Sequence, residues 1–495
     1  MSRIIVVGAG FGGLAVAGRL AAAGHQVTVF EQATEVGGKL GRWERASPHG
    51  AFRFDTGPSL LTLPQVLTEL FADIGGGLSE ADLVPLDPIV RHVFPDGSQV
   101  DSCADHHEFR RRIAAALGPR AAADWDRLWR RAERVWNTSW RHVLTADVDT
   151  WLRVLRLAWR IGDVAAVAPG RSLHALGRSY LHDPRLRMLL DRYATYVGSD
   201  PRRAPAALVA IPYAELRFGG WYVPGGLSRI ADCLLSRLRD LGVTVHTGAR
   251  VASIETRDGR ACGVRLADGT LEVAETVVAN ADAAEVYGNL LPLHRSGARL
   301  ARRLVKRSLS GFRLLLAVAP DAPRFPHHTV FFPRDYEAEF DAIFARPARP
   351  VPDPAILVTA PEDPATSPPG HRAWSILVNA PPHGRGPDAV DWDRPRLAEE
   401  YADRILEVLA SRGADVRNRV LFRDVLTPAD LERRTASPGG AIYGTPSHGV
   451  AGLLRPPNRT PVRGLFLVGG SVHPGGGLPL VALSAKLVAE RIGPA

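Results

Sequence analysis

The sequence predicts an α/β fold in which helices pack on a parallel sheet, and two observations point to it. An apolar run at residues 3–7 leads through glycines into an alanine-rich stretch at 14–23 and a second strand pattern at 26–30. This is the order of a βαβ unit. Near the other end of the chain, an apolar strand at 465–468 again leads through glycines into a helix at about 479–491. Both ends are therefore expected to contribute to one α/β domain.

The middle of the chain alternates between helical and strand-rich regions. Residues 105–196 contain many Trp, Arg and Leu residues and few strand signals, so this region is predicted to be helical. Asp-Gly pairs at 258–259 and 268–269 indicate tight turns between short strands. The other predicted elements are helices at 227–241 and 397–410, strands at 243–246, 251–256, 263–267, 270–274 and 276–279, and strands mixed with proline-rich loops at 309–382.

The composition is that of a globular protein. The 495 residues are 45% hydrophobic and 23% charged, with a net charge of +9. Nearly all of the positive charge is arginine, dispersed along the chain, and no nucleic-acid-reading module is recognisable. We expect no signal peptide and no transmembrane helix, because no apolar run is long enough. The expected location is cytoplasmic, with peripheral attachment to a membrane.

Neither a disulfide framework nor a metal site is expected. Cys103, Cys233 and Cys262 are widely separated and form no CxxC pair, which fits a reducing compartment. The adjacent histidines at 106–107 and 327–328 lack the helical spacing of a zinc site.

The glycines after the first strand form a GxGxxG motif. Gly8 permits the tight turn, Gly10 lets the backbone approach a pyrophosphate, and Gly13 lets helix and strand pack closely. The helix N-terminus offers N–H groups and a partial positive charge to phosphates. Glu31, at the end of the second strand, can accept hydrogen bonds from ribose hydroxyls. A strand before the motif and a helix after it predict an adenine dinucleotide site.

Two further features favour FAD over NAD. Gly38 and Lys39 follow the second strand, where a glycine-rich loop and a cation are expected near the pyrophosphate. The loop Gly469-Gly470-Ser471 resembles the C-terminal flavin motif of glutathione-reductase-like and amine-oxidase-like flavoproteins, although those proteins often have an acidic or hydroxyl residue at the position of Gly470. No second GxGxxG motif opens a helix elsewhere. The predicted FAD-binding residues are Gly8, Gly10, Gly12, Gly13, Glu31, Gly38, Lys39, Val251, Gly469, Gly470, Ser471 and Leu478.

Several stretches resemble the phytoene-desaturase family of bacterial carotenoid desaturases. They are FDTGP at 54–58, GWYVPGGLS at 220–228, VVANAD at 277–282 and the whole segment 464–491, and they span nearly the entire chain. Residues 183–198 and 440–449 are similar to the branch of 1-hydroxycarotenoid 3,4-desaturases, or hydroxyneurosporene dehydrogenases.

The resemblance implies a Rossmann-type, glutathione-reductase-like FAD domain, a mixed α+β substrate domain and a helical, membrane-facing lobe. The implied boundaries are 1–80 for the first FAD segment, 81–215 for the lobe, 216–300 for the continued FAD domain, 301–430 for the substrate sheet and 431–495 for the C-terminal flavin segment. It leaves the oligomeric state open.

The implied activity is FAD-dependent dehydrogenation of phytoene or a later, hydroxylated carotenoid in carotenoid biosynthesis. Hydride loss to the flavin would leave a delocalised cation, so that a weak base suffices for the proton that follows. His473, in the flavin-facing loop, is the candidate base, with a loop-stabilising role as the alternative. Asp55 is a candidate for a turn or a helix cap instead.

Other enzymes and one binding function stay open at this point. A carotenoid oxygenase or ketolase, an amine oxidase or a porphyrinogen oxidase of the same superfamily would share the cofactor fold. A covalent flavin link is disfavoured because no cysteine lies near the C-terminal loop. A flavin-fold protein that carries a lipid without redox turnover is the alternative outside the enzymes.

An insoluble carotenoid would have to be taken from a bilayer, so a surface-binding element is expected. On a helix at 151–167, Arg153, Arg156 and Arg160 would share one face opposite Trp151, Leu155 and Trp159. A second candidate is the basic stretch at 295–307. The alternative for both is a core-packed helix with a solvated charged face.

Overall fold

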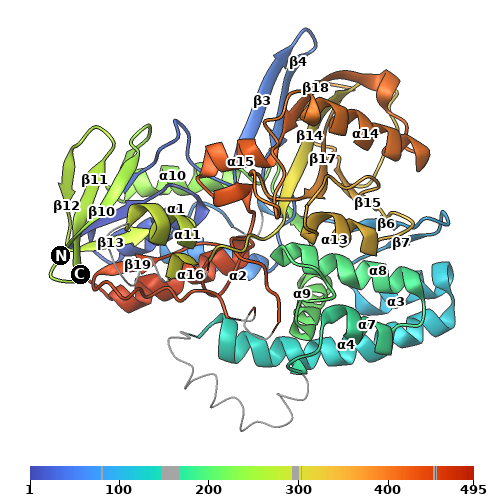
Figure 1. The fold of residues 1–495 in the computed structure, drawn as a ribbon, viewed down its shortest axis with the longest axis horizontal. Helices are drawn as coiled ribbons and strands as arrows, with labels where there is room; N and C mark the ends of the chain where they lie inside the picture. The colour runs from blue at the N-terminus through green and yellow to red at the C-terminus, as the bar shows by residue number, and fades with distance from the viewer. Residues whose placement is uncertain (80–81, 147–166, 292–299, 303, 450–451, 453) are drawn as a thin grey trace.

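A computed structural model describes residues 1–79, 82–146, 167–291, 300–302, 304–449, 452 and 454–495. It has three parts (Figure 1). A domain with a parallel sheet carries both chain termini, a seven-stranded sheet stands beside it, and a group of helices lies below that second sheet in the view. The two candidate membrane helices fall largely or partly outside the described residues, namely at 151–166, 295–299 and 303.

The first sheet is fully parallel, which confirms the predicted α/β fold. Its strand order is β19-β13-β1-β2-β9, so the N-terminal strand lies at the centre and the C-terminal strand at one edge. Its strands are β1 (Arg3–Val7), β2 (Gln26–Phe30), β9 (Thr244–His246), β13 (Thr276–Ala279) and β19 (Leu465–Leu467).

Alternate residues of β1 face two different layers. Ile4 and Val6 pack on the helical side, and Ile5 and Val7 face a three-stranded antiparallel sheet. Burial on both faces explains why the strand is apolar throughout. The helical layer contains α1 (Phe11–Ala22), α2 (Pro64–Asp73), α10 (Arg229–Asp240) and α16 (Leu478–Ile492), and the antiparallel sheet contains β10 (Val251–Arg257), β11 (Arg260–Leu266) and β12 (Leu271–Val273).

Helix α1 begins at Phe11 rather than at the predicted residue 14. The weak helix propensity of Gly12 and Gly13 suggested the later start. Both glycines are nevertheless buried in the first helical turn, where a side chain at Gly13 would lie 2.0 Å from the Gly8 carbonyl oxygen. Close packing therefore outweighs local propensity here.

The second sheet has the order β18-β14-β17-β16-β15-β6-β7. One face packs on α14 (Leu397–Ser411), where Phe312 and Leu314 meet Ile405 and Leu409. Two of its strands, β6 and β7, come from the segment that we assigned to the helical lobe, and β6 pairs in parallel with β15. The strands are β6 (Arg91–Val93), β7 (Gln99–Asp101), β14 (Ser310–Val318), β15 (His328–Phe331), β16 (Ile356–Thr359), β17 (Arg372–Ala380) and β18 (Val420–Leu426).

The opposite face of this sheet is covered at one end by a hairpin. Phe52 and Phe54 of the hairpin pack on Leu315 and Ala317 of β14. The hairpin was not predicted, because its first strand is mostly charged and half exposed. Its strands are β3 (Arg42–Ser47) and β4 (Gly50–Asp55).

The helical lobe packs around large buried side chains such as Trp125 and Tyr193. Among the described residues, no helix is long and apolar enough to cross a membrane. The main lobe helices are α3 (His106–Leu117), α4 (Pro119–Ser139), α7 (Leu173–Tyr180), α8 (Pro184–Arg192) and α9 (Ala210–Phe218). The short turns nearby are η2 (Trp140–Leu144), η3 (Tyr193–Val197) and η4 (Ala206–Val209).

The smaller elements connect these parts. They are β5 (Val84–Pro85), β8 (Trp221–Tyr222), α11 (Ala283–Glu285), η5 (Val286–Leu290), α13 (Glu337–Phe344), η6 (Arg417–Arg419), α15 (Pro428–Thr435) and η7 (Pro438–Gly440).

Candidate active site

The glycine turn between β1 and α1 has the shape of a phosphate cradle. Gly8 has a φ of +93°, which glycine adopts readily. A side chain at Gly10 would lie 2.7 Å from the amide oxygen of Asn280, so this position in the turn has no room for one. No side chain caps the N-terminus of α1. Its first N–H groups therefore have no intrahelical partner and are suited to a pyrophosphate.

Glu31 lies buried at the end of β2 and is tied to this turn. One carboxylate oxygen accepts the N–H of Ala9 at 2.6 Å, and the other accepts the N–H of Ala33 at 2.9 Å. A carboxylate has about four acceptor positions, so capacity remains for ribose hydroxyls. The backbone of Ala249 donates to the Glu31 carbonyl, which brings the start of β10 and the buried Val251 to the same end of the sheet.

The loop that contains Gly37 and Gly38 packs across the glycine turn. The side chain of Lys39, the next residue, makes its hydrogen bonds in another part of the molecule. The N–H of Gly37 donates to the Ala9 carbonyl, and a side chain at Gly38 would lie 3.2 Å from the Gly10 Cα. The ammonium of Lys39 donates to the carbonyls of Ala441 and Ile442 at 2.9 and 2.8 Å. Burial lowers the pKa of Lys39 to about 8, against the opposing charge of Asp282. A Lys39 contact to the pyrophosphate stays a prediction.

The two ends of the chain meet at the carboxyl edge of the parallel sheet. A side chain at Gly12 would lie 3.4 Å from the Cα of Gly469, so α1 and the C-terminal glycine loop are in direct contact. The amide of Asn280 donates to the Val468 carbonyl, and the hydroxyl of Ser471 accepts the N–H of Ala283. The loop then leads to Leu478, where α16 begins without a side-chain cap. This is the joint arrangement that FAD binding by both ends requires.

Asp55 links the first and second of the matched sequence stretches. Its carboxylate accepts the N–H groups of Leu227 and Ser228 at 2.7 and 3.1 Å, and these are the two residues that precede α10. Burial raises the pKa of Asp55, and these hydrogen bonds and the charge of Arg313 oppose the rise. Of the turn and helix-cap roles that we considered for Asp55, these contacts fit the turn role, at a turn distant in the sequence.

Arg313 fixes the loop that follows Asp55 to the second sheet. Its guanidinium donates to the carbonyl of Gly57 at 2.9 Å and to the hydroxyl of Ser375 at 2.6 Å. Burial lowers its pKa to about 10, while Asp55 raises it. A buried arginine that reaches across to a loop carbonyl was not singled out from the sequence, since it lies within an ordinary apolar strand.

A cavity of about 850 Å³ lies where the three parts of the molecule meet. One wall is the face of the second sheet that α14 does not cover, including Val330, Leu357 and Leu377. Another wall comes from the lobe helices, and a third is the C-terminal loop at 474–480. Gly475, Gly476 and Gly477 at the end of the C-terminal loop thus border a substrate-sized space.

The imidazole of His473 is not among the residues that line this cavity. The side chain is buried, and its Nε2 lies 3.0 Å from the Ala146 carbonyl oxygen. Its own carbonyl accepts a hydrogen bond from the amide of Asn458. These contacts fit the loop-stabilising alternative, and a role as base stays a prediction.

The cavity wall also contains buried charges that sequence reasoning missed. Arg192, at the end of α8, and Glu215, within α9, both line it. A glutamate in the largely apolar helix stretch Ala210–Phe218 was the available signal, because a buried carboxylate needs partners.

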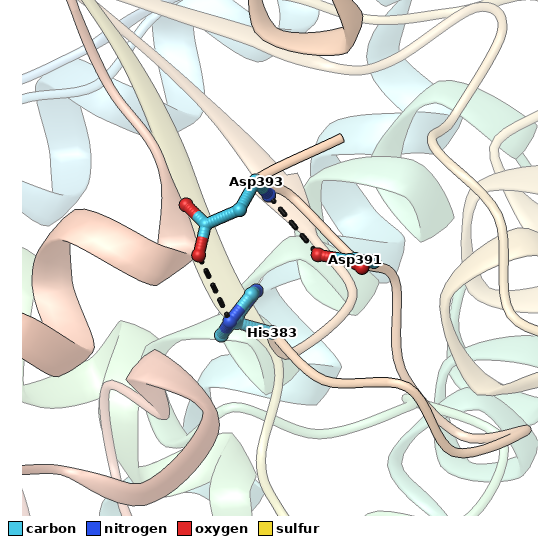
Figure 2. A group of neighbouring side chains, drawn as sticks. All are labelled: His383, Asp391 and Asp393. Atoms are coloured by element: carbon cyan, nitrogen blue, oxygen red, sulfur yellow. Dashed lines mark hydrogen bonds and ion pairs between the residues drawn. The ribbon is translucent and has the colours of Figure 1, made fainter. Parts of the chain in front are cut away.

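Figure 2 shows the described residues that come nearest to a metal-binding arrangement. The imidazole of His383 lies 3.6 Å from a carboxylate oxygen of Asp393, and the Asp393 N–H donates to Asp391. Asp393 is already paired with Arg433 at 2.9 Å, and Asp391 with Arg385 at 3.4 Å. This group carries no metal assignment, because both carboxylates have cationic partners.

Residues 11–493 match the family described as flavin containing amine oxidoreductase. The chain belongs to this family. It is therefore an FAD-dependent oxidoreductase, as the sequence predicted.

Named relatives and solved structures extend over the whole chain. A 4,4'-diapolycopene oxygenase of Methylomonas is 34% identical, covering 99% of this chain and 98% of the relative. A hydroxyneurosporene desaturase of Cereibacter sphaeroides is 35% identical, covering 99% and 97%. An oxidoreductase structure from Methanosarcina mazei aligns with a TM-score of 0.65 at 19% identity, over 99% of this chain and 100% of that one. That last likeness concerns the fold alone.

Proposed function

We propose that this protein is an FAD-dependent carotenoid desaturase, which dehydrogenates an acyclic polyene. The observation that carries the proposal is the cavity, which is largely apolar and bordered by the C-terminal glycine loop of the dinucleotide fold. Its volume, about 850 Å³, lies in the upper part of the range of roughly 300–1,000 Å³ that small-molecule sites occupy. A long hydrocarbon gains affinity from such walls through the hydrophobic effect.

The names of the relatives support the same substrate class. The 35% identical relative is named for desaturation of hydroxyneurosporene, and the 34% identical relative for oxygenation of diapolycopene. Both named compounds are polyenes. Oxygenation is accordingly the second candidate reaction, on the same substrate class.

When bound, FAD supplies the electron acceptor for the dehydrogenation. The residues of the chain position the polyene and exclude water. Three consecutive glycines at 475–477 line the cavity, so that no side chain separates this loop from a substrate. Alternate side chains of the second sheet, such as Leu357 and Leu377, form the facing wall. Because the walls are apolar, a delocalised cation on the polyene would be shielded from attack by water.

We also propose that the enzyme works at a membrane surface. The support is the insolubility of a polyene in water, together with the sequence pattern at 151–167.

Expression in a host that makes phytoene, or a hydroxylated acyclic carotenoid, tests the proposed activity. Pigments are extracted and measured by absorbance and by mass. The expected product lacks two hydrogens per step and absorbs at longer wavelength. A product that gains oxygen would support the oxygenase instead, and unchanged pigments with FAD-loaded protein in both hosts would refute both candidates.

The Gly10→Ala variant provides the negative control, since its side chain would lie 2.7 Å from the Asn280 amide oxygen within the phosphate cradle. Gly288→Ala is the matched control, because a side chain at Gly288 would have no neighbour within 4 Å. Only the first is expected to lose FAD and activity.

A further inference from the structure

Polar residues interrupt the largely apolar wall of the cavity, and four of them lie close together at its lobe side. We call Arg192, Tyr196, Glu215 and Tyr336 the polar cluster; all four line the cavity. They come from the end of α8, from η3, from α9 and from the residue before α13. Polar side chains buried in an apolar site need partners, so a member that lacks one within the protein is suited to bind a ligand.

Glu215 is fully supplied with hydrogen-bond donors. Its side chain is 1% exposed, and its two oxygens accept the hydroxyls of Tyr193 at 2.7 Å and Tyr196 at 3.0 Å. Burial raises the pKa of Glu215, and the charge of Arg192 and the two tyrosine hydrogen bonds oppose this. The carboxylate is thus held in place by the protein itself.

Arg192 and Tyr336 have donors that the protein leaves unused. The guanidinium of Arg192 lies over the Tyr196 ring, 5.1 Å from its centroid, while its Nη1 has no hydrogen-bond partner among the residues that the structure describes. The hydroxyl of Tyr336 also has none. The two residues are only 7% and 5% exposed. Two buried donors on one cavity wall form a site for an oxygen acceptor that a ligand supplies.

We propose that the polar cluster binds a neutral oxygen substituent, a hydroxyl or a carbonyl, near one end of the polyene substrate, with Arg192 and Tyr336 as the donors. This proposal rests on the proposed function. A purely hydrocarbon terminus offers no acceptor and would leave both donors unpaired. A carboxylate terminus is disfavoured, because the charge of Arg192 is already balanced by the nearby Glu215, and a second negative charge would be buried in an apolar cavity.

The cluster and the C-terminal loop border the same cavity. The ring of Tyr443 packs against the C-terminal loop, since a side chain at Gly476 would lie 2.4 Å from it. Burial raises the pKa of Tyr443 to about 12, and the charges of Arg455 and Arg192 act on the same hydroxyl in the opposite direction. Arg192 and the C-terminal loop thus both face the space in which the polyene is proposed to lie.

The test compares two acyclic carotenoids of equal length, one with a terminal tertiary hydroxyl and one with a hydrocarbon terminus. FAD-loaded wild-type enzyme, Tyr336→Phe and Arg192→Leu are assayed with each substrate in phosphatidylcholine vesicles, and kcat/KM is measured. We expect Tyr336→Phe to lower kcat/KM for the hydroxylated substrate by about tenfold, and Arg192→Leu by about 10- to 100-fold. The ratio of kcat/KM for the hydroxylated substrate to kcat/KM for the hydrocarbon substrate should fall by the same factors.

Tyr401→Phe is the matched control, because the Tyr401 hydroxyl is also buried without a partner among the described residues, but belongs to α14 and lies in the core away from the cavity. This substitution should not change kcat/KM for either substrate. Arg192→Lys should restore part of the selectivity that Arg192→Leu loses. An acid-terminated carotenoid added as a third substrate must be the poorest; if it is the best, the neutral-oxygen assignment is wrong.

Failure of this inference and failure of the proposed function give different results. If wild-type enzyme desaturates both substrates and neither variant changes their ratio, the cluster does not recognise oxygen, although the enzyme is a desaturase. If no carotenoid is turned over by FAD-loaded enzyme, the proposed function itself is wrong. Parallel loss of both activities together with FAD would reflect misfolding in Arg192→Leu, and Tyr336→Phe, which removes one atom, then decides.

Discussion

The clearest test of the cofactor site is the substitution of Glu31 by glutamine. Each carboxylate oxygen of Glu31 accepts one backbone N–H, from Ala9 on one side and Ala33 on the other. Glutamine has nearly the same shape but only one oxygen, so its amide group must face one of the two N–H donors. The variant therefore loses the charged acceptor for ribose and also loosens the turn that cradles the pyrophosphate.

The expected loss follows from these two hydrogen bonds. A hydrogen bond to a charged group contributes about 1.5–3 kcal/mol, and a buried donor left unpaired costs about 1–3 kcal/mol. The cost of the unpaired donor is partly present in the apoprotein as well, so that part cancels from the binding free energy. We therefore assign a loss of about 1.5–3 kcal/mol to FAD binding. At 1.4 kcal/mol per factor of ten, FAD affinity should fall by about 10- to 150-fold.

FAD affinity is measured by titrating apoprotein and following the quenching of flavin fluorescence. Glu255→Gln is the matched control, since Glu255 lies on β10 in the same domain and pairs with Arg265 at the surface. A Kd for Glu31→Gln within twofold of wild type would refute the assignment of Glu31 to the cofactor. Equal losses in both variants would point to a general effect on the domain.

Three further substitutions test other parts of the molecule. Burial raises the pKa of Glu339 to about 7, so its contribution to stability is present below pH 4.5 and is lost as the pH rises through 7. The free energy of unfolding in urea should differ between wild type and Glu339→Gln by an amount that changes by about 3 kcal/mol from pH 4.5 to pH 8. A difference that stays constant with pH would contradict this. His473→Ala should keep FAD and change turnover by less than about threefold if the side chain stabilises its loop, whereas a loss of about 100-fold would establish it as the base. Replacement of Arg153, Arg156 and Arg160 by glutamate should abolish flotation with anionic vesicles, and wild-type flotation would exclude this stretch as the docking element.

The parts of the fold that depend on local sequence signals could be predicted well. Strand β13 has the bounds predicted for it, and Glu31 lies at the end of β2 as the spacing required. Apolar β-branched runs, glycine turns and an alanine-rich helix are signals that neighbouring residues carry together. The direct contact of Gly12 with Gly469 follows from the parallel order of β1, β13 and β19, and the resemblance of both chain ends to flavoproteins implied it.

Features that depend on distant pairing could not be predicted in the same way. Strand β6 is short and joins the second sheet only because β15, far along the chain, offers a parallel edge. The first strand of the hairpin β3–β4 is mostly polar, since one of its faces remains in solvent. The polar cluster is a stronger case, because its residues are scattered between 192 and 336, and the matched stretch 183–198 did not indicate which of its side chains face the cavity.

The polar cluster also explains how an apolar cavity could hold a polyene in one defined position. The hydrophobic effect is non-directional and depends on the area removed from water, so a uniform hydrocarbon could slide along such walls with little change in free energy. Affinity would then be high, while the bond presented to the loop at 475–477 would be undefined. One or two directional donors at a fixed distance from that loop remove this ambiguity, because only one placement of the chain lets its oxygen reach Arg192 and Tyr336. On this reasoning the apolar wall sets how tightly the polyene binds, and the polar cluster sets which of its bonds reacts.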